Sequence, residues 1–173
     1  MSEHLRLSEI VESLPAGGRL LGSDPLIYGV THDSRAVRPG DLFVAIPGAA
    51  ADGHDFVDRA FAAGAAAVVV ERDIDGVSRV VVPDARSALP WLAAAAYGDP
   101  SQRLPVAGVT GTNGKTTVTH LLEQIMLADG RSPGVVGTIG ARIGSTQASV
   151  ARTTPEASDL QRLLAEMVDA GVD

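Results

Sequence analysis

The residues best suited to chemistry lie in one glycine-rich stretch, GVTGTNGKTT, at positions 108–117. Its last part fits the phosphate-binding pattern G-x-x-x-x-G-K-[ST], with Gly114, Lys115 and Thr116 in the final three places. The opening glycine of that pattern would fall on residue 109, which is valine. The stretch therefore resembles a phosphate-binding loop with one glycine out of place.

Glycines at Gly108 and Gly111 preserve the physical requirement, because small residues let successive backbone N–H groups converge on phosphate oxygens at the start of a helix. Lys115 adds a positive charge for the β- and γ-phosphates, and the hydroxyl of Thr116 is a ligand for Mg²⁺. We therefore predict a phosphate-binding loop. The alternative, a glycine-rich turn with a lone surface lysine, leaves the order of strand, loop and amphipathic helix unexplained.

Two further polar clusters are candidate sites that also have simple structural roles. Thr153 and Thr154 stand at a predicted helix start, where hydroxyls and free amides favour an anionic group, but Thr154 is also a suitable helix cap. Asp33, Ser34 and Arg35 form either part of a site or a capped turn with a local ion pair. From the residues alone, both interpretations of each cluster stay open.

The remaining polar residues indicate structure rather than chemistry. The histidines do not have the spacing of metal ligands, and Asp52-Gly53 favours a turn. Carboxylates near the end of the chain fall on the polar face of a predicted helix, where water solvates them. The residues concerned are His4, His54 and His120, for which we expect surface positions, and Glu156, Asp159, Glu166 and Asp169.

Composition argues against several classes of protein. The 173 residues carry a formal net charge of −7, and the basic residues are scattered without interleaved aromatics, which argues against a nucleic-acid-binding surface. The absence of cysteine excludes disulfides and thiol catalysis. The N-terminal sequence lacks the order of a signal peptide, and the longest apolar run is too short to span a bilayer. We expect a cytoplasmic protein without membrane insertion.

Short β-rich runs alternate with helical patterns in the first part of the chain, which predicts a layered α/β unit. Hydrophobic residues make up 45% of the chain and aromatic residues only 3%, a mixture typical of helices packed on parallel strands. We expect helices at residues 5–14, 55–63 and 85–97, and strands at residues 26–31, 42–46, 66–71 and 79–82.

Prolines and a glycine in GDPSQRLP, residues 98–105, mark a domain junction. Beyond it we expect a strand at 105–109, a helix from the glycine loop to about Gly130, a strand at 134–137, a hairpin around Gly144 and a helix from Thr154 to Gly171.

The predicted organisation is thus an α/β domain at residues 1–98, a linker at 99–104 and the start of a mostly parallel P-loop domain at 105–173. The second part is too short to be a whole domain of this kind. We expect its open sheet to leave apolar helix faces poorly covered. These faces are Leu121 with Ile125, and Leu163 with Met167.

The chain resembles the Mur ligase family, whose loop T-G-T-N-G-K-[ST] also lacks the opening glycine. TGTNGKTT at 110–117, GTIG at 137–140 and TTPEASDLQ at 153–161 are together similar to the MurE branch. GVTHDSRAVRPGDLFVAIPG…DGHDFVDRAFAAGAAAVVVE, within residues 29–71, is similar to the uridine-binding domain that MurE and MurF share. The resemblance covers nearly all of the chain, which corresponds to about the first third of a MurE chain.

Carried over by position, the resemblance implies an ATP site with Lys115 as the catalytic residue and Thr116 as the Mg²⁺ ligand. It also implies contacts to a UDP-sugar peptide, in which an all-alanine segment at 49–51 offers only its backbone. The implied ATP-binding residues are Gly111, Thr112, Asn113, Gly114, Lys115, Thr116 and Thr117; the implied substrate-binding residues are His32, Ser34, Ala49, Ala50, Ala51, Arg152, Thr153 and Thr154.

The implied reaction is ATP-dependent amide-bond formation in peptidoglycan precursor synthesis. A MurE ligase adds the third amino acid to UDP-N-acetylmuramoyl-L-alanyl-D-glutamate through an acyl phosphate, so the implied partners are this dipeptide and a free amino acid, with ATP and Mg²⁺ as cofactors and a monomeric full-length enzyme. This chain would carry only the UDP-binding and phosphate-loop parts and be inactive alone. The alternatives are a non-catalytic UDP-sugar-binding fragment, a MurF-like ligase fragment and a P-loop NTPase with an unrelated leading domain.

Overall fold

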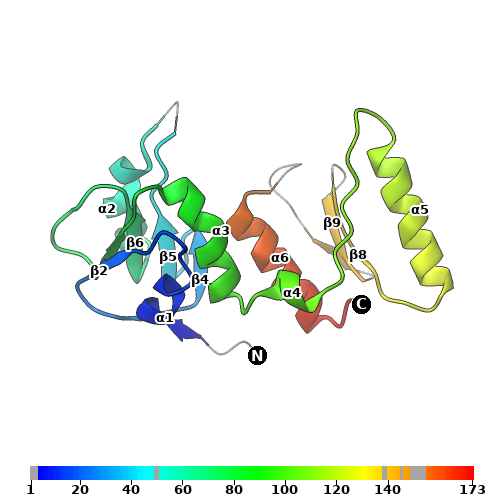
Figure 1. The fold of residues 1–173 in the computed structure, drawn as a ribbon, viewed down its shortest axis with the longest axis horizontal. Coiled ribbons are helices and arrows are strands. Elements are labelled where there is room, and N and C mark those ends of the chain that lie inside the picture. Colours follow the sequence, from blue (N-terminus) through cyan, green and yellow to red (C-terminus); the bar gives the residue numbers. More distant parts are fainter. Residues whose placement is uncertain (1–3, 49–50, 138–139, 145, 149–154) are drawn as a thin grey trace. The chain divides into compact units, whose positions relative to one another are not determined.

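The computed structural model describes residues 4–48, 51–137, 140–144, 146–148 and 155–173. The chain divides into two compact units, Ser2–Gly98 and Asp99–Asp173, shown from blue to green and from green to red in Figure 1. Each unit is described by itself. No helix among the described residues combines the length and the apolar character needed to cross a bilayer.

The first unit is built on a five-stranded sheet with the order β2-β7-β6-β5-β4. Its neighbours from β4 to β7 are parallel, and β2 pairs antiparallel with β7 at one edge. Every residue of β5, which is apolar after Asp41, and of the wholly apolar β6 is buried, as expected for strands covered on both faces. The strands are β2 (Arg19–Leu21), β4 (Gly29–Thr31), β5 (Asp41–Val44), β6 (Ala67–Val70) and β7 (Arg79–Val81).

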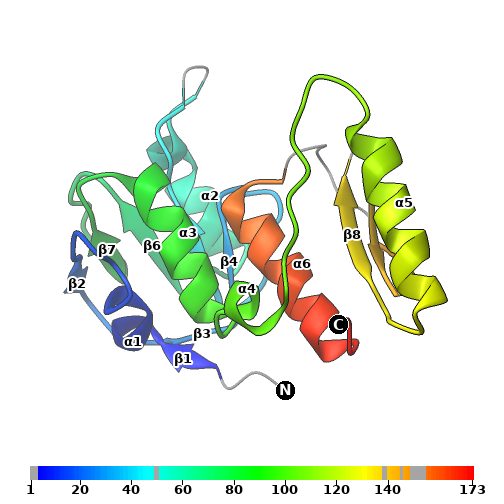
Figure 2. The same cartoon turned by 45° about the vertical axis from the view of Figure 1, so that its right-hand side comes forward.

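Helices cover both faces of this sheet, as Figure 2 shows. On one face, α2 (Val57–Ala62) packs Val57 and Ala60 against Phe43 and Val68 of the strands. On the other lie α1 (Leu7–Val11) and α3 (Ala85–Ala96), which contact each other. Asp84 caps the start of α3, because its carboxylate accepts a hydrogen bond of 2.9 Å from the Ser87 N–H. The mixed α/β class with a mostly parallel main sheet is therefore confirmed.

Several predicted elements of this unit are shorter than expected. The predicted helix at 5–14 is replaced by a short strand β1 (Leu5–Arg6) and α1, and β1 pairs with β3 (Leu26–Ile27). The predicted strand at 26–31 is divided at Tyr28, whose N–H donates to the Gly40 carbonyl instead of to a strand neighbour. The predicted helix at 55–63 consists of a 3₁₀ turn, η1 (Gly53–Phe56), followed by α2.

The second unit contains three helices and three strands among its described residues. The strands form one antiparallel sheet of order β10-β9-β8, and β9 with β10 forms the hairpin expected around Gly144. The elements are α4 (Pro100–Arg103), α5 (Lys115–Ala128), β8 (Gly134–Gly137), β9 (Gly140–Ile143), β10 (Thr146–Ala148) and α6 (Ala157–Asp169).

Two predictions for this unit are wrong. Residues 105–109 are not a strand, because no described strand pairs with them, and Val106 remains 64% exposed. Leu163 and Met167 are buried, at 0% and 3% exposure, since α6 packs into the unit. The expectation of poor cover is confirmed only for α5, where Ile125 is 64% exposed and Leu121 58% exposed.

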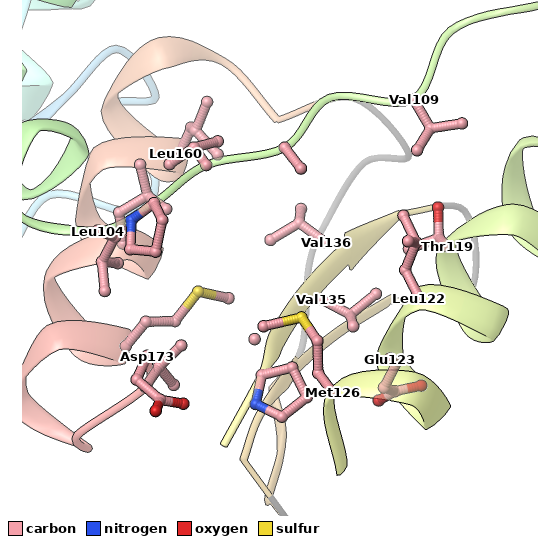
Figure 3. A pocket seen from close by; sticks show the side chains of 18 of the residues that line it. Leu104, Val109, Thr119, Leu122, Glu123, Met126, Val135, Val136, Leu160 and Asp173 are labelled. Atoms are coloured by element: carbon pink, nitrogen blue, oxygen red, sulfur yellow. The ribbon is translucent and has the colours of Figure 1, made fainter. Parts of the chain in front are cut away.

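An apolar cavity of about 490 Å³ opens between the segment that precedes the glycine loop, α5, β8 and α6. Leu104, Leu122, Val135 and Leu160 point into it from these different elements, as Figure 3 shows. Glu123 also lines the cavity. Its buried carboxylate binds the Arg142 side chain of β9 and the ring of His120, which ties α5 to the hairpin.

Candidate functional site

The glycine loop adopts a backbone conformation that requires glycine at two positions. Gly111 has φ +143° and Gly114 has φ +79°, both in the region that side chains disfavour. Gly114 is also the N-cap of α5, and no side chain caps this helix start. The loop therefore presents backbone amides and the positive end of a 14-residue helix to any group that lies before it.

Lys115, the first residue of α5, bends back over the loop. Its ammonium group donates a hydrogen bond to the carbonyl oxygen of Gly111. The helix continues normally behind it, with the Thr119 hydroxyl donating to the Lys115 carbonyl at 2.8 Å. An anionic ligand in the loop would attract the same ammonium group, because a phosphate oxygen is a stronger acceptor than a carbonyl.

The residues expected to bind ATP all lie in this loop and the first turn of α5, and all are exposed. Thr116 stands one residue after Lys115, so its hydroxyl belongs to the helix turn that begins at the loop. Exposed amides, an ammonium group and a hydroxyl at one helix start fit a triphosphate with bound Mg²⁺. Among the described residues, no cluster of histidine and carboxylate side chains forms a separate metal site.

The three described residues that are expected to bind the substrate follow the carboxyl ends of two neighbouring parallel strands. His32 and Ser34 come directly after β4, and Ala51 lies in the connection that follows β5. Ligands of open α/β sheets bind outside the carboxyl ends of the strands. Ser34 is 8% exposed, His32 is half-buried and Ala51 is exposed.

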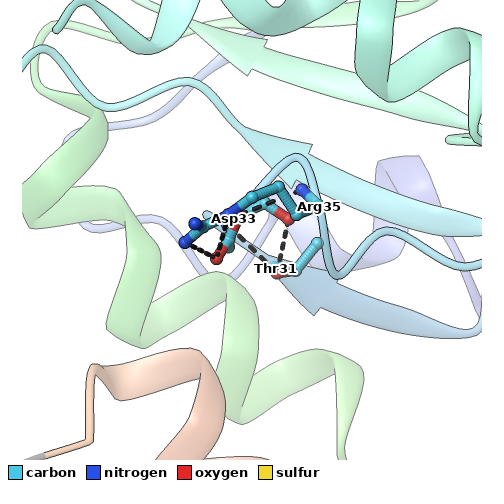
Figure 4. A network of polar contacts seen from close by, with 3 residues as sticks. All are labelled: Thr31, Asp33 and Arg35. Carbon is cyan, nitrogen blue, oxygen red and sulfur yellow. Dashed lines mark hydrogen bonds and ion pairs between the residues drawn. The ribbon is translucent and has the colours of Figure 1, made fainter. Parts of the chain in front are cut away.

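Between His32 and Ser34, Asp33 forms the capped turn considered above. Its carboxylate accepts hydrogen bonds from the Arg35 N–H at 2.9 Å and from the guanidinium Nη2 at 2.7 Å, and the Asp33 N–H donates to the Thr31 hydroxyl (Figure 4). These bonds with Arg35 lower the pKa of Asp33 to about 2. The turn and its local ion pair are therefore confirmed, and they fix the backbone on both sides of Ser34.

A closed turn follows β5. Pro47 and Asp52 form an isolated antiparallel bridge, and the Gly48 N–H donates to the Ala51 carbonyl at 3.0 Å. Asp52 caps η1 by accepting the His54 N–H at 2.9 Å, which fits the turn expected at Asp52-Gly53. Five of the expected substrate-binding residues, Ala49, Ala50, Arg152, Thr153 and Thr154, lie outside the described residues.

The surface position expected for His54 is wrong. Its side chain is 3% exposed and lies between Asp52 and the backbone N–H of Glu71, at the carboxyl end of β6. The local signal was present, because an aspartate two residues before a histidine can cap the turn that carries it. The burial, however, depends on a strand 17 residues away. His4 is exposed and His120 partly exposed.

Two family models match the chain. The model described as "Mur ligase family, catalytic domain" matches residues 26–97, and the model described as "Mur ligase middle domain" matches residues 109–173. The first match includes the parallel strands β4 to β7 of the sheet and the candidate uridine site. The second begins in the glycine loop.

Curated relatives agree with these matches over almost the whole chain. The UDP-N-acetylmuramoyl-L-alanyl-D-glutamate–2,6-diaminopimelate ligase of Geobacillus thermodenitrificans is 45% identical over 98% of this chain, and that of Chlorobaculum tepidum is 47% identical over 96%. The chain spans 35% and 34% of these relatives, about a third of their length.

Solved structures show the same relation. The structure of a UDP-N-acetylmuramoyl-L-alanyl-D-glutamate–2,6-diaminopimelate ligase matches 98% of this chain and 34% of its own with a TM-score of 0.70 and 26% identity. MurF from Acinetobacter baumannii matches 73% of this chain and 28% of its own with a TM-score of 0.61 and 32% identity. From the two family models and these relatives together, the chain belongs to the Mur ligase family.

Proposed function

We propose that this chain carries the uridine-binding part and the phosphate loop of an ATP-dependent ligase of peptidoglycan precursor synthesis. The ligase joins a third amino acid to UDP-N-acetylmuramoyl-L-alanyl-D-glutamate through an acyl phosphate. The relatives reported above are named for 2,6-diaminopimelate, which makes that amino acid the proposed one. The chain alone holds substrate and nucleotide without completing the ligation, since it spans only about a third of these relatives.

The strongest support for the proposal is the start of α5, where Gly114 is a left-handed N-cap and Lys115 folds over the loop. Phosphoryl transfer needs positioning and charge neutralisation more than covalent help from the protein. Loop amides from Gly111 to Thr116 would orient the triphosphate of ATP, and Lys115 would bind the β- and γ-phosphates. Thr116 would hold Mg²⁺, which supplies charge neutralisation of the phosphates when bound.

The first unit would bind the substrate at its nucleotide end. Ser34 and His32 after β4 and the turn closed by Gly48 and Ala51 after β5 lie at the edge where parallel α/β sheets bind ligands. The fixed backbone around Ser34 supports this role, because a rigid turn loses little conformational entropy on binding. Thr153 and Thr154 are proposed to contact the sugar-peptide end, as the resemblance implies.

Calorimetric titration of the 173-residue chain tests the proposal. UDP-N-acetylmuramoyl-L-alanyl-D-glutamate and MgATP, added separately, should each bind. Lys115→Ala should weaken MgATP about tenfold or more, the loss expected for a charge-assisted hydrogen bond, and leave the affinity for the UDP dipeptide unchanged. Arg131→Ala is the matched control, because it removes a partly exposed positive charge from the same unit beyond the other end of α5.

The other candidates give different results in the same titrations. MgATP binding without any response to the UDP dipeptide would indicate a P-loop NTPase with an unrelated leading domain. UDP-dipeptide binding without MgATP binding would indicate a non-catalytic binding fragment. Tighter binding of the UDP tripeptide than of the UDP dipeptide would indicate a MurF-like ligase.

A further inference from the structure

A histidine is buried where parallel strands of the first unit end, and the proposed ligand contacts do not include it. The imidazole of His54 is 3% exposed, although it belongs to the 3₁₀ turn η1 that follows an exposed loop residue, Ala51. Buried polar side chains are retained where their hydrogen bonds are satisfied. The hydrogen-bond partners of the His54 ring show which segments of the chain it connects.

Both ring nitrogens of His54 have partners, and these partners define its tautomer. Nε2 accepts a hydrogen bond of 3.0 Å from the Glu71 N–H, so this nitrogen carries the lone pair. Nδ1 therefore carries the proton and donates it to Oδ1 of Asp52 at 2.7 Å. The neutral ring thus connects the backbone just after β6 with the carboxylate that follows β5.

The Asp52 carboxylate fixes the turn between β5 and η1. Besides His54, it accepts a hydrogen bond from the guanidinium of Arg72 at 2.8 Å, while its own backbone pairs with Pro47 in the bridge that closes the turn. Gly53 allows this closure, because an added Cβ would lie only 2.4 Å from the Ile46 nitrogen. The ends of the turn are therefore held by the Pro47–Asp52 bridge and by the hydrogen bond from the Gly53 N–H to the Ile46 carbonyl.

The same network reaches the start of α3. The Glu71 side chain accepts the Ala85 N–H at 2.8 Å, at the first residue of that helix. The imidazole thus connects the backbone segments after β5 and after β6, and the Glu71 side chain links the second of these to the segment before α3. All three lie on the sheet edge that also carries Ser34.

We propose that His54 is a positioning residue of the uridine-diphosphate site, acting through Asp52 on the turn that Pro47, Gly48, Ala51 and Asp52 close. The inference rests on the proposed function, since it needs the first unit to bind uridine compounds. A positioning role of His54 differs from a purely structural role in what each of its two hydrogen bonds contributes. The bond from Nδ1 to Asp52 controls affinity, whereas the bond from Glu71 to Nε2 contributes to stability alone.

Two substitutions separate the two bonds. In His54→Asn the terminal amide N–H takes the place of Nδ1 and keeps the bond to Asp52. In His54→Gln the longer side chain places its amide oxygen where Nε2 lies and keeps the bond from Glu71 while losing Asp52. Asp24→Asn is the control, because Asp24 accepts two hydrogen bonds from Ser8 at 2.8 Å each, away from the proposed site.

Uridine diphosphate is titrated calorimetrically into each folded variant, and melting temperatures are recorded. We expect His54→Gln to weaken binding about tenfold, and His54→Asn to stay within about threefold of the wild type, because only the first loses the bond to a carboxylate. The melting temperature should fall in both His54 variants. It should also fall in Asp24→Asn, but that variant should keep the wild-type affinity for uridine diphosphate.

Equal affinities of the two His54 variants, or a larger loss in His54→Asn, would overturn the inference while the proposed function stands. A wild-type chain that does not bind uridine diphosphate would overturn both. If His54→Gln does not fold, Asp52→Asn tests the same bond from its other end, because it replaces the carboxylate that accepts the Nδ1 proton with a neutral amide. A loss of affinity there supports the inference, and an unchanged affinity overturns it.

Discussion

The backbone conformation of the glycine loop predicts the effect of a substitution at Gly114. Its φ of +79° costs an L-residue with a side chain about 1–2 kcal/mol, and no atom lies within 4 Å of the Cβ that alanine would add. The penalty of Gly114→Ala is therefore conformational, without any collision. The loop is exposed and makes few contacts. In the variant without bound nucleotide, we therefore expect the loop backbone to shift to another conformation and avoid this penalty. The cost then falls on nucleotide binding, which needs the original conformation.

We expect Gly114→Ala to weaken MgATP binding by this conformational penalty of about 1–2 kcal/mol, which raises the dissociation constant by a factor of roughly 5–30. The melting temperature should change little. Gly130→Ala is the matched control, since Gly130 has φ +80°, an equally empty surrounding and a place just after the other end of α5. Calorimetric titration of MgATP into both variants and the wild type measures the difference. Unchanged affinity in Gly114→Ala, or an equal loss in Gly130→Ala, would refute the reasoning.

Two further predictions concern stability. The bonds from Arg35 hold the pKa of Asp33 at about 2, below its ordinary 3.8, so this carboxylate stabilises the fold above about pH 4 and the contribution is lost as the pH falls toward 2. Asp33→Asn should therefore lower the free energy of unfolding at pH 7 by no more than about 1 kcal/mol, the range of partly exposed ion pairs, and urea titrations should show the difference shrinking by pH 2.5. In the second unit, Leu163→Ala should cost about 2–5 kcal/mol because Leu163 is fully buried, whereas Leu121→Ala, at 58% exposure, should change stability by less than about 0.5 kcal/mol. Amide hydrogen exchange of residues 99–173 compares the two, and similar protection in both variants would contradict the packing of α6.

The elements that could be predicted from the sequence are those whose own residues show a hydrophobic pattern. The valine-rich run of β6 and the apolar run of β5 indicate buried strands because their neighbours on both faces must be apolar. The strand β2 has three residues and no such pattern, and it exists because it pairs with β7 from much later in the chain. Residues 105–109 show the reverse: their composition favours a strand, yet no described strand pairs with them.

The candidate site divides in the same way. Gly114 and Lys115 could be identified because a phosphate loop is a local structure, with its glycines, its lysine and its helix adjacent in sequence. His54 could not, since its burial results from the Glu71 backbone and its position at a sheet edge. Sequence patterns located the loop, and only the three-dimensional structure located the buried histidine that supports the turn.

Amide NMR spectra of the ¹⁵N-labelled chain, titrated with UDP-N-acetylmuramoyl-L-alanyl-D-glutamate, test the central claim most directly. The account predicts saturable shifts of the amides from Thr31 to Arg35 and around Gly48 and Ala51, with the signals of β1 and β3 unchanged. An absence of shifts, or shifts confined to residues 99–173, would contradict a uridine-binding first unit.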